Sequence, residues 1–220
     1  MAGTDYAAGT DYPTGTDYPT GTDFTADTDA DYAAGADIDY TADTDGGARA
    51  VPFLASRIDR AVIAIVRIGV ALLWLQNLSW KTPPDFGEGD PPGGLYLSTT
   101  YAVSHEVLHP YAWLVERLVL PNFTFFAWMV LLVEASLGAF LLVGLATRFW
   151  ALVGIAQTLV IMLSVVNSPD EWIWSYLLML LVHAALFATA AGRYGGLDGV
   201  LRPEWQGSQS WLARLLVRAS

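Results

Sequence analysis

The chain has 220 residues, of which 54% are hydrophobic, and it contains no cysteine. Without cysteine this chain cannot form a disulfide, a thiolate metal site or a cysteine-ligated iron–sulfur cluster. Its formal net charge of −11 arises in residues 1–47, which hold eleven Asp and neither Lys nor Arg, whereas the remaining residues include eleven acidic and eleven basic ones. The rest of the chain has no excess of basic charge, so nucleic acid is not an expected partner.

Residues 1–50 form the first predicted segment, an acidic repeat tail. A six-residue unit that begins Gly-Thr-Asp recurs over residues 3–24 and continues in degenerate form to residue 47. The segment repels itself, lacks aliphatic periodicity and is interrupted by Gly and Pro, so it cannot bury enough apolar surface to offset the entropy lost on ordering. We predict that this tail is disordered.

Four long apolar stretches follow the tail, at residues 61–80, 123–147, 149–166 and 172–191. A helix needs about 20 residues, each rising 1.5 Å, to cross roughly 30 Å of hydrocarbon. The stretches reach or approach this length, so residues 51–203 are predicted to form a membrane domain with four spans. The expected fold class is an all-α integral membrane protein, built as a four-helix transmembrane bundle.

The basic residues near the ends of these stretches predict the orientation. Five arginines lie near one set of ends, namely Arg57, Arg60, Arg148, Arg193 and Arg202. Lys81 and Arg117 lie near the opposite ends. Because basic residues favour the cytoplasmic side, we expect a multi-pass protein of the cell membrane with both termini in the cytoplasm.

Two further segments are predicted to lie along the membrane surface. Residues 95–121 are apolar and aromatic, but Glu106, Glu116 and Arg117 interrupt them, which favours an outer interfacial helix over a fifth span. Residues 204–220 place tryptophan and leucine on one helical face beside arginines. This second pattern is typical of an amphipathic helix on the cytoplasmic interface.

Residues 105–109 match His-Glu-x-x-His, a motif in which two histidines one helical turn apart bind zinc and the glutamate activates water. His105, Glu106 and His109 are therefore a weak candidate metal site, and a membrane zinc metalloprotease is an alternative function. Two observations disfavour it. Pro110 pushes the preceding residue out of the helical conformation, and Asp198, a third ligand by analogy with intramembrane proteases, is predicted to lie on the other side of the bilayer.

Three of the spans carry a residue that hydrocarbon penalises, namely Arg67, Glu134 and His183. A charge near the bilayer centre costs about 3 kcal/mol or more, so such residues usually face the interior of a bundle. Residue counts from the cytoplasmic ends place the three in one layer, where Gln157 of the third span can join them. Arg67 and Glu134 are the natural ion pair, because guanidinium binds carboxylate strongly.

Two interpretations of this polar layer remain open. It could be a structural clasp that fixes how the helices align, since leaving either charge alone would cost several kcal/mol. It could also be a site that binds a quinone head group or relays protons, with His183 as the titratable member.

The spans also contain short motifs in a fixed order. They comprise Arg67, Gly69 and Lys81 in and after the first span, Glu134, Gly138, Gly144, Leu145 and Arg148 around the second, and Gly-Arg-Tyr-Gly-Gly-Leu-Asp from Gly192 to Asp198. In their order and spacing, residues 57–201 resemble the DoxX/DoxD family of small four-span membrane proteins. The resemblance implies a quinone-linked membrane subunit, as in thiosulfate:quinone oxidoreductase, where the DoxD-like chain works with a second subunit. It also implies that Asp198 caps or pins the inner end of the fourth span.

The main functional prediction is a membrane subunit of a quinone-linked oxidoreductase. Arg67, Glu134 and His183 are its candidate catalytic residues, and together with Gln157 they are the candidates for binding quinone. No haem or iron–sulfur cluster is expected, because the chain lacks Cys and its spans lack paired histidines. Expected partners are membrane lipid, a second oxidoreductase subunit and, as a further possibility, copies of the same chain in a homo-oligomer. The alternative from another class is a non-enzymatic membrane scaffold that recruits a redox partner.

Overall fold

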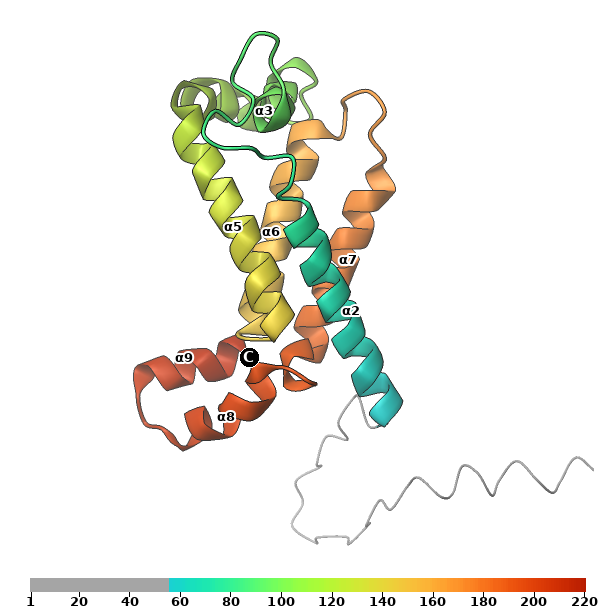
Figure 1. Ribbon diagram of the computed structural model, residues 1–220, viewed down its shortest axis with the longest axis vertical. Coiled ribbons are helices and arrows are strands. Elements are labelled where there is room, and N and C mark those ends of the chain that lie inside the picture. Colours follow the sequence, from blue (N-terminus) through green and yellow to red (C-terminus); the bar gives the residue numbers. More distant parts are fainter. Residues whose placement is uncertain (1–55) are drawn as a thin grey trace, which may run out of the picture. The chain divides into compact units, whose positions relative to one another are not determined.

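The computed structural model describes residues 56–220, and every regular element in this range is a helix. The predicted disorder of residues 1–50 lies outside the described residues. Four long helices correspond to the four predicted apolar stretches, namely α2 (Arg57–Gln76), α5 (Phe123–Val143), α6 (Thr147–Val165) and α7 (Ile173–Thr189). All four run lengthwise through the described part of the chain (Figure 1).

Shorter helices lie at both ends of the long ones. At one end, called here the α3 end, are α3 (Gly94–Ser104), α4 (His109–Leu114), the π-helical turn η1 (Val115–Val119) and the 3-10 turn η2 (Leu120–Asn122). At the other, called the α8 end, are η3 (Ala191–Arg193), α8 (Leu197–Gly207) and α9 (Trp211–Ala219) (Figure 1). The segment 95–121, predicted as one interfacial helix, is thus divided into several short helices, the last of which leads directly into α5.

Capping interactions set the ends of the long helices. Ser56 and Asp59 form a capping box at the start of α2: the Asp59 N–H donates to Ser56 Oγ at 3.0 Å and the Ser56 N–H donates to Asp59 Oδ2 at 3.4 Å. The first long helix therefore begins at Arg57, earlier than the apolar stretch alone predicts. α5 ends at Gly144, whose φ of +69° is a left-handed conformation that glycine adopts without a Cβ clash.

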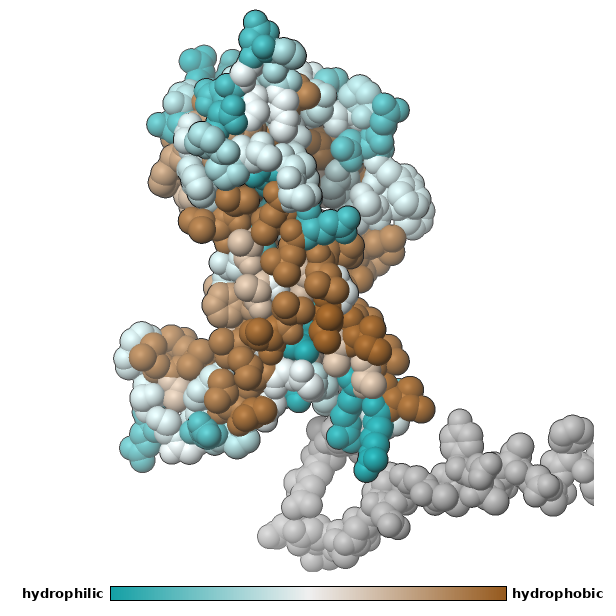
Figure 2. Space-filling view, in the orientation of Figure 1, coloured by the Kyte–Doolittle hydropathy of each residue, from teal (hydrophilic) through white to brown (hydrophobic). Residues whose placement is uncertain are grey.

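Two helical stretches of the described residues are long and apolar enough to cross a membrane. They are His109–Val143, with 35 residues, and α6, with 19 residues. α7 is apolar but has 17 residues, and α2 has 20 residues that include four charged ones. The middle of the long helices presents a hydrophobic surface, whereas hydrophilic residues gather at the α3 end (Figure 2). Such an apolar outer surface fits contact with lipid.

The core lies where the four long helices meet, and it is built from Trp74, Leu137, Leu141 and Leu186, each at most 1% exposed. Gly154 of α6 allows α7 to approach closely, because a Cβ at this position would lie only 2.1 Å from the Cδ2 atom of His183. Small residues commonly permit such close contacts between apolar helices. This packing fixes the positions of the polar side chains described next.

Candidate functional site

Glu134, in the middle of α5, is the centre of a buried polar cluster. Its Oε2 atom accepts hydrogen bonds from Lys81 Nζ at 2.6 Å and Asn77 Nδ2 at 3.2 Å. Its Oε1 atom accepts from Gln157 Nε2 of α6 at 3.1 Å. We call these four residues the Glu134 cluster. Because Glu134 is 0% exposed, the three donors replace the water that its carboxylate would otherwise bind.

Lys81 supplies the positive charge of this cluster, and it is the only lysine in the chain. Its Nζ atom donates to the backbone oxygen of Asn77 at 3.0 Å and lies 4.3 Å from the ring centroid of Trp80, which adds a cation–π contact. Burial lowers the pKa of Lys81, and the Glu134 carboxylate opposes this effect. The cation therefore depends on Glu134 to remain charged while buried.

The predicted ion pair between Arg67 and Glu134 is wrong, because Lys81 is the ion-pair partner of Glu134 and Arg67 lies elsewhere. Arg67 is 0% exposed and its Nη2 atom donates to the backbone oxygen of Gly195 at 3.1 Å, near the α8 end. The Nη1 atom of Arg67 packs against Gly144, where a Cβ would lie 1.5 Å from it. Gly144 follows Glu134 by ten residues, which is about 15 Å along a helix axis.

His183 is held by two hydrogen bonds, neither of which involves a residue of the Glu134 cluster. Trp74 Nε1 donates to His183 Nε2 at 3.0 Å, and His183 Nδ1 lies 2.7 Å from the backbone oxygen of Met179. Because an indole N–H can only donate and a carbonyl can only accept, a neutral imidazole with its proton on Nδ1 satisfies both contacts. His183 thus connects α7 to α2 through Trp74.

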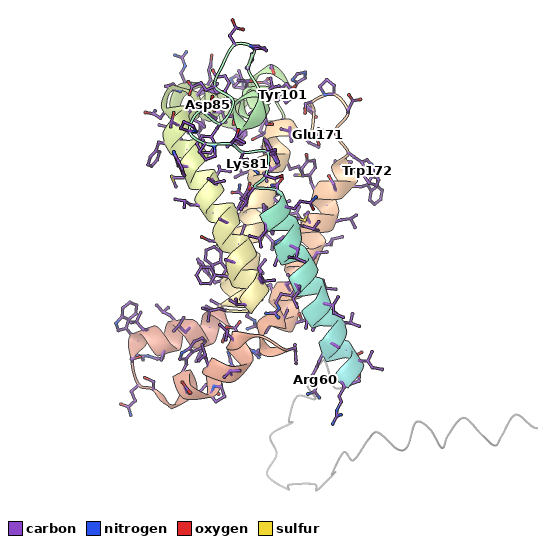
Figure 3. The ribbon with its side chains drawn as sticks, in the orientation of Figure 1. Arg60, Lys81, Asp85, Tyr101, Glu171 and Trp172 are labelled. Atoms are coloured by element: carbon purple, nitrogen blue, oxygen red, sulfur yellow. The ribbon has the colours of Figure 1, made fainter. Side chains whose placement is uncertain are left out.

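A cavity of about 630 Å³ adjoins the Glu134 cluster on the side of the α3 end. All four cluster residues line it, and α3 contributes part of its lining above Lys81 (Figure 3). The other lining residues are mostly apolar or aromatic and include Leu73, Trp74, Trp80, Leu95, Phe126 and Ile161. A cavity of this size, largely apolar with a few convergent polar groups, is the usual form of a small-molecule site.

A second polar pair lines this cavity between α4 and α6. The hydroxyl of Tyr111 lies 2.7 Å from Ser164 Oγ, and Ser164 Oγ donates to the backbone oxygen of Val160 at 2.9 Å. Of the sequence-predicted site residues, Glu134 and Gln157 line the cavity. Arg67 and His183 are not among the residues that line it, so the structure does not bring the predicted set together at one site.

A protein-family model matches most of the chain. The family model described as TQO small subunit DoxD matches residues 62–218. The chain belongs to the DoxD family. TQO denotes thiosulfate:quinone oxidoreductase, so this DoxD chain is related to a membrane subunit of a multi-subunit complex. Among the curated proteins and the solved structures, no match was found.

The closing motif of this DoxD chain forms a clasp at the α8 end. Asp198 Oδ1 accepts from the Ala146 N–H at 2.7 Å, its Oδ2 accepts from the Thr147 N–H at 2.9 Å, and its own N–H donates to the Gly144 oxygen at 2.8 Å. Asp198 therefore caps the N-terminus of α6 and fixes the turn between α5 and α6. The expectation that it caps the fourth span is wrong, because its carboxylate accepts from the start of α6. Its Oδ2 atom does pack against Gly192, just beyond the fourth span, where a Cβ would lie 2.3 Å from it.

The His-Glu-x-x-His motif of the DoxD chain does not adopt the geometry of a zinc site. α3 ends at Ser104 and α4 begins at His109, so the two histidines are not on successive turns of one helix. His105 Nδ1 lies 3.0 Å from Ser104 Oγ, and His109 Nδ1 lies 3.3 Å from Glu106 Oε2. Within residues 56–220, no group of three or more His, Cys, Asp or Glu side chains is arranged to hold a metal.

Lys81 and Asn77 are the site residues that sequence reasoning missed. Both lie just beyond α2, where a charged or amide side chain is ordinary. Asn77 was therefore not considered, and Lys81 was interpreted only as a basic residue of the outer side and as part of the family motif. Two signals could have identified them. First, Lys81 is the only lysine in the chain, which has ten arginines. Second, it follows Asn77 by four residues, and this spacing places two residues on the same side of a helical turn.

Proposed function

We propose that this chain is the membrane subunit of a quinone-linked oxidoreductase of the thiosulfate:quinone type, and that the cavity beside the Glu134 cluster binds the quinone. The observation that carries the proposal is a buried, charged hydrogen-bonding cluster at one side of a largely apolar cavity within a DoxD-family fold. A quinone has matching features, with carbonyl oxygens that accept hydrogen bonds on an apolar ring.

The proposed topology has α2, α5, α6 and α7 as four membrane spans. The apolar surface of these helices and the 35-residue length of His109–Val143 support it. Arginines concentrate at the α8 end, which supports a cytoplasmic location for this end and for both termini. In this arrangement α9 lies on the cytoplasmic interface, and the Glu134 cluster and its cavity lie in the outer half of the membrane.

The donors of the cluster suit recognition of a quinone carbonyl. The Lys81 ammonium has three N–H groups, of which two donate to the Asn77 oxygen and Glu134. Gln157 likewise uses one amide N–H for Glu134 and retains a second. Both residues line the cavity. A quinone carbonyl oxygen placed beside them could therefore accept a hydrogen bond from the Lys81 ammonium and another from the Gln157 amide.

The charge of Lys81 has a further role during reduction. Negative charge develops on a quinone oxygen as electrons arrive, and an ammonium already held in place stabilises that charge without rearrangement. Glu134 fixes the position of the ammonium and favours its charged form. The electrons come from the donor substrate, directly or through a second subunit, as expected for a small subunit of a larger complex.

The pH dependence of quinone binding tests this role of Lys81. Because burial lowers the pKa of Lys81, the ammonium is lost at a lower pH than in an ordinary lysine, whose pKa is about 10.4. Quinone affinity should therefore fall as the pH rises towards about 10. In the Lys81→Arg variant the alkaline fall should disappear, because guanidinium stays protonated throughout this range. Dissociation constants measured from about pH 6 to pH 10 check the prediction.

Two controls test the tyrosines that also line the cavity, Tyr111 and Tyr176. Burial raises the pKa of Tyr111 above that of an ordinary phenol, and the Tyr111→Phe and Tyr176→Phe variants should each retain the alkaline fall if Lys81 is responsible. The proposal is rejected if Lys81→Arg binds quinone with an unchanged alkaline fall, or if no quinone binds to the native chain at any pH.

A further inference from the structure

The cavity has two exposed sides, and they differ in how they are closed. On the side of α4 and α6, Leu114 and Val160 are both exposed and line the cavity. The hydrogen bond between Tyr111 and Ser164 connects the two helices at this side. On the side of α2 and α7, Leu73 is 55% exposed and Trp80 is 42% exposed, although both also line the cavity.

The side between α2 and α7 has no comparable closure near the α3 end. The Trp74–His183 hydrogen bond joins the two helices, two residues before α2 ends at Gln76. Beyond this bond α2 continues only to Gln76, and the chain then turns through residues 77–80. In the described part of the chain, no hydrogen bond or ring contact joins this end of α2 to α7, and the end of α2 stands apart from the start of α7 (Figure 1). On α7, Ser175, Tyr176 and Met179 line the cavity on this side.

Exposed apolar residues flank this opening on α2 and α7, and the exposed carboxylate of Glu171, which accepts a hydrogen bond from the Tyr176 hydroxyl, also lines the cavity on the α7 side. Leu72 on α2 and Leu178 on α7 are 53% and 52% exposed, and neither lines the cavity. Both are exposed apolar residues of the long helices, so an opening between them faces the same medium as these side chains. Glu134 is 0% exposed and marks the buried side of the cavity, whereas Leu73, which also lines the cavity, is 55% exposed.

We infer that the opening between α2 and α7 is a lateral portal through which a membrane-dissolved ligand enters the cavity, and that the ligand's hydrocarbon chain lies across Leu73 when its polar head is at the Glu134 cluster. This inference rests on the proposed function, because the polar head is taken to be that of a quinone. It adds the route of entry, the orientation of the bound molecule and a selectivity for ligands with a long apolar chain.

The absence of native cysteine makes a direct test possible, because a single introduced cysteine is the only thiol in the chain. Three single-cysteine variants of the full chain are compared in lipid vesicles. Leu73→Cys marks the proposed portal, Leu114→Cys marks the opposite side, and Leu132→Cys is an exposed control on α5 that does not line the cavity. The rate of labelling by a lipid-soluble maleimide is measured for each.

Two quinones with the same fully substituted ring, which does not add thiols, are used as ligands. One carries a long isoprenoid chain and the other a short, water-soluble chain. At ten times its dissociation constant, the long-chain quinone should slow labelling of Leu73→Cys about tenfold, because about a tenth of the sites remain free. The short-chain quinone should bind the cavity yet protect this position much less, and neither should protect Leu114→Cys or Leu132→Cys.

The outcomes separate the portal from the quinone site itself. If both quinones bind but the long-chain quinone leaves labelling of Leu73→Cys unchanged, the portal is rejected and the quinone site stands. Selective protection of Leu114→Cys would also reject it, since the chain would then leave between α4 and α6. If neither quinone binds, measured as saturable retention of radiolabelled quinone by the protein in vesicles, the proposed function fails and the portal fails with it.

Discussion

Replacing Glu134 by Ala is expected to lower the free energy of unfolding by about 3–5 kcal/mol, the range measured when one partner of a buried ion pair is removed. The substitution leaves the Lys81 ammonium without its carboxylate, although the side chain is only 2% exposed. It also removes the acceptor for Asn77 and Gln157. Unfolding of the purified protein in mixed micelles, followed by circular dichroism, measures the change.

The matched variant removes both charges and keeps most of the volume. Combining Glu134→Met with Lys81→Met should recover most of the lost stability, because no unpaired charge then remains buried. Each Met variant alone should resemble Glu134→Ala in its effect. If the double variant instead loses the sum of the two single losses in unfolding free energy, the ion pair is contradicted, because residues that do not interact contribute additively.

The Asp198→Ala variant is expected to lose about 2–3 kcal/mol of unfolding free energy, from two hydrogen bonds to a charged acceptor at a helix N-terminus. Asp198 is 0% exposed, and its carboxylate receives the N–H groups of Ala146 and Thr147 at the start of α6. Without it these N–H groups stay buried and unpaired. The same micelle unfolding experiment measures the loss.

Two further variants distinguish the cap from a general effect of removing an aspartate. Asp198→Asn keeps one side-chain oxygen and should show an intermediate loss. Asp90→Ala, at an exposed loop position, should change stability by less than about 0.5 kcal/mol, as is usual at surface sites. If Asp198→Ala behaves like Asp90→Ala, the clasp at the α8 end does not hold the turn between α5 and α6.

Sequence patterns located the long helices and part of the site. The apolar stretches correspond to α2, α5, α6 and α7, because predominantly apolar composition over about 20 residues is a strong signal. Glu134 and Gln157 were both expected in one buried polar set, and they do form a hydrogen bond. The family was recognised from motifs in residues 57–201, and the family model matches residues 62–218.

The error in pairing came from the alignment of helices along their axes. Counting residues inward from each span's end assumed that all spans begin at one level. In the structure α2 extends past α5 at the α8 end, so Arg67 is level with Gly144, whereas Glu134 is level with the far end of α2. That offset depends on side-chain packing between helices, which no single span's sequence reveals.

The capping of α6 by Asp198 also could not be predicted from the sequence. Asp198 caps a helix that begins about fifty residues before it, and this contact depends on how η3 and α8 fold back against the turn between α5 and α6. The His-Glu-x-x-His motif does not form a zinc site because the backbone between its two histidines is not one helix. Pro110 is the second residue of α4, and the chain between Ser104 and His109 is not helical.

The most direct test of quinone binding beside the Glu134 cluster is to map where a photoreactive quinone attaches to the full chain. If the cavity beside the Glu134 cluster binds quinone, the label should appear in peptides that include residues 73–81 and 157–165, and excess unlabelled quinone should suppress it. The Lys81→Met and Glu134→Met double variant should lose most of this labelling while remaining folded. Labelling confined to α8 and α9, or unchanged by unlabelled quinone and by the double variant, would contradict the central claim.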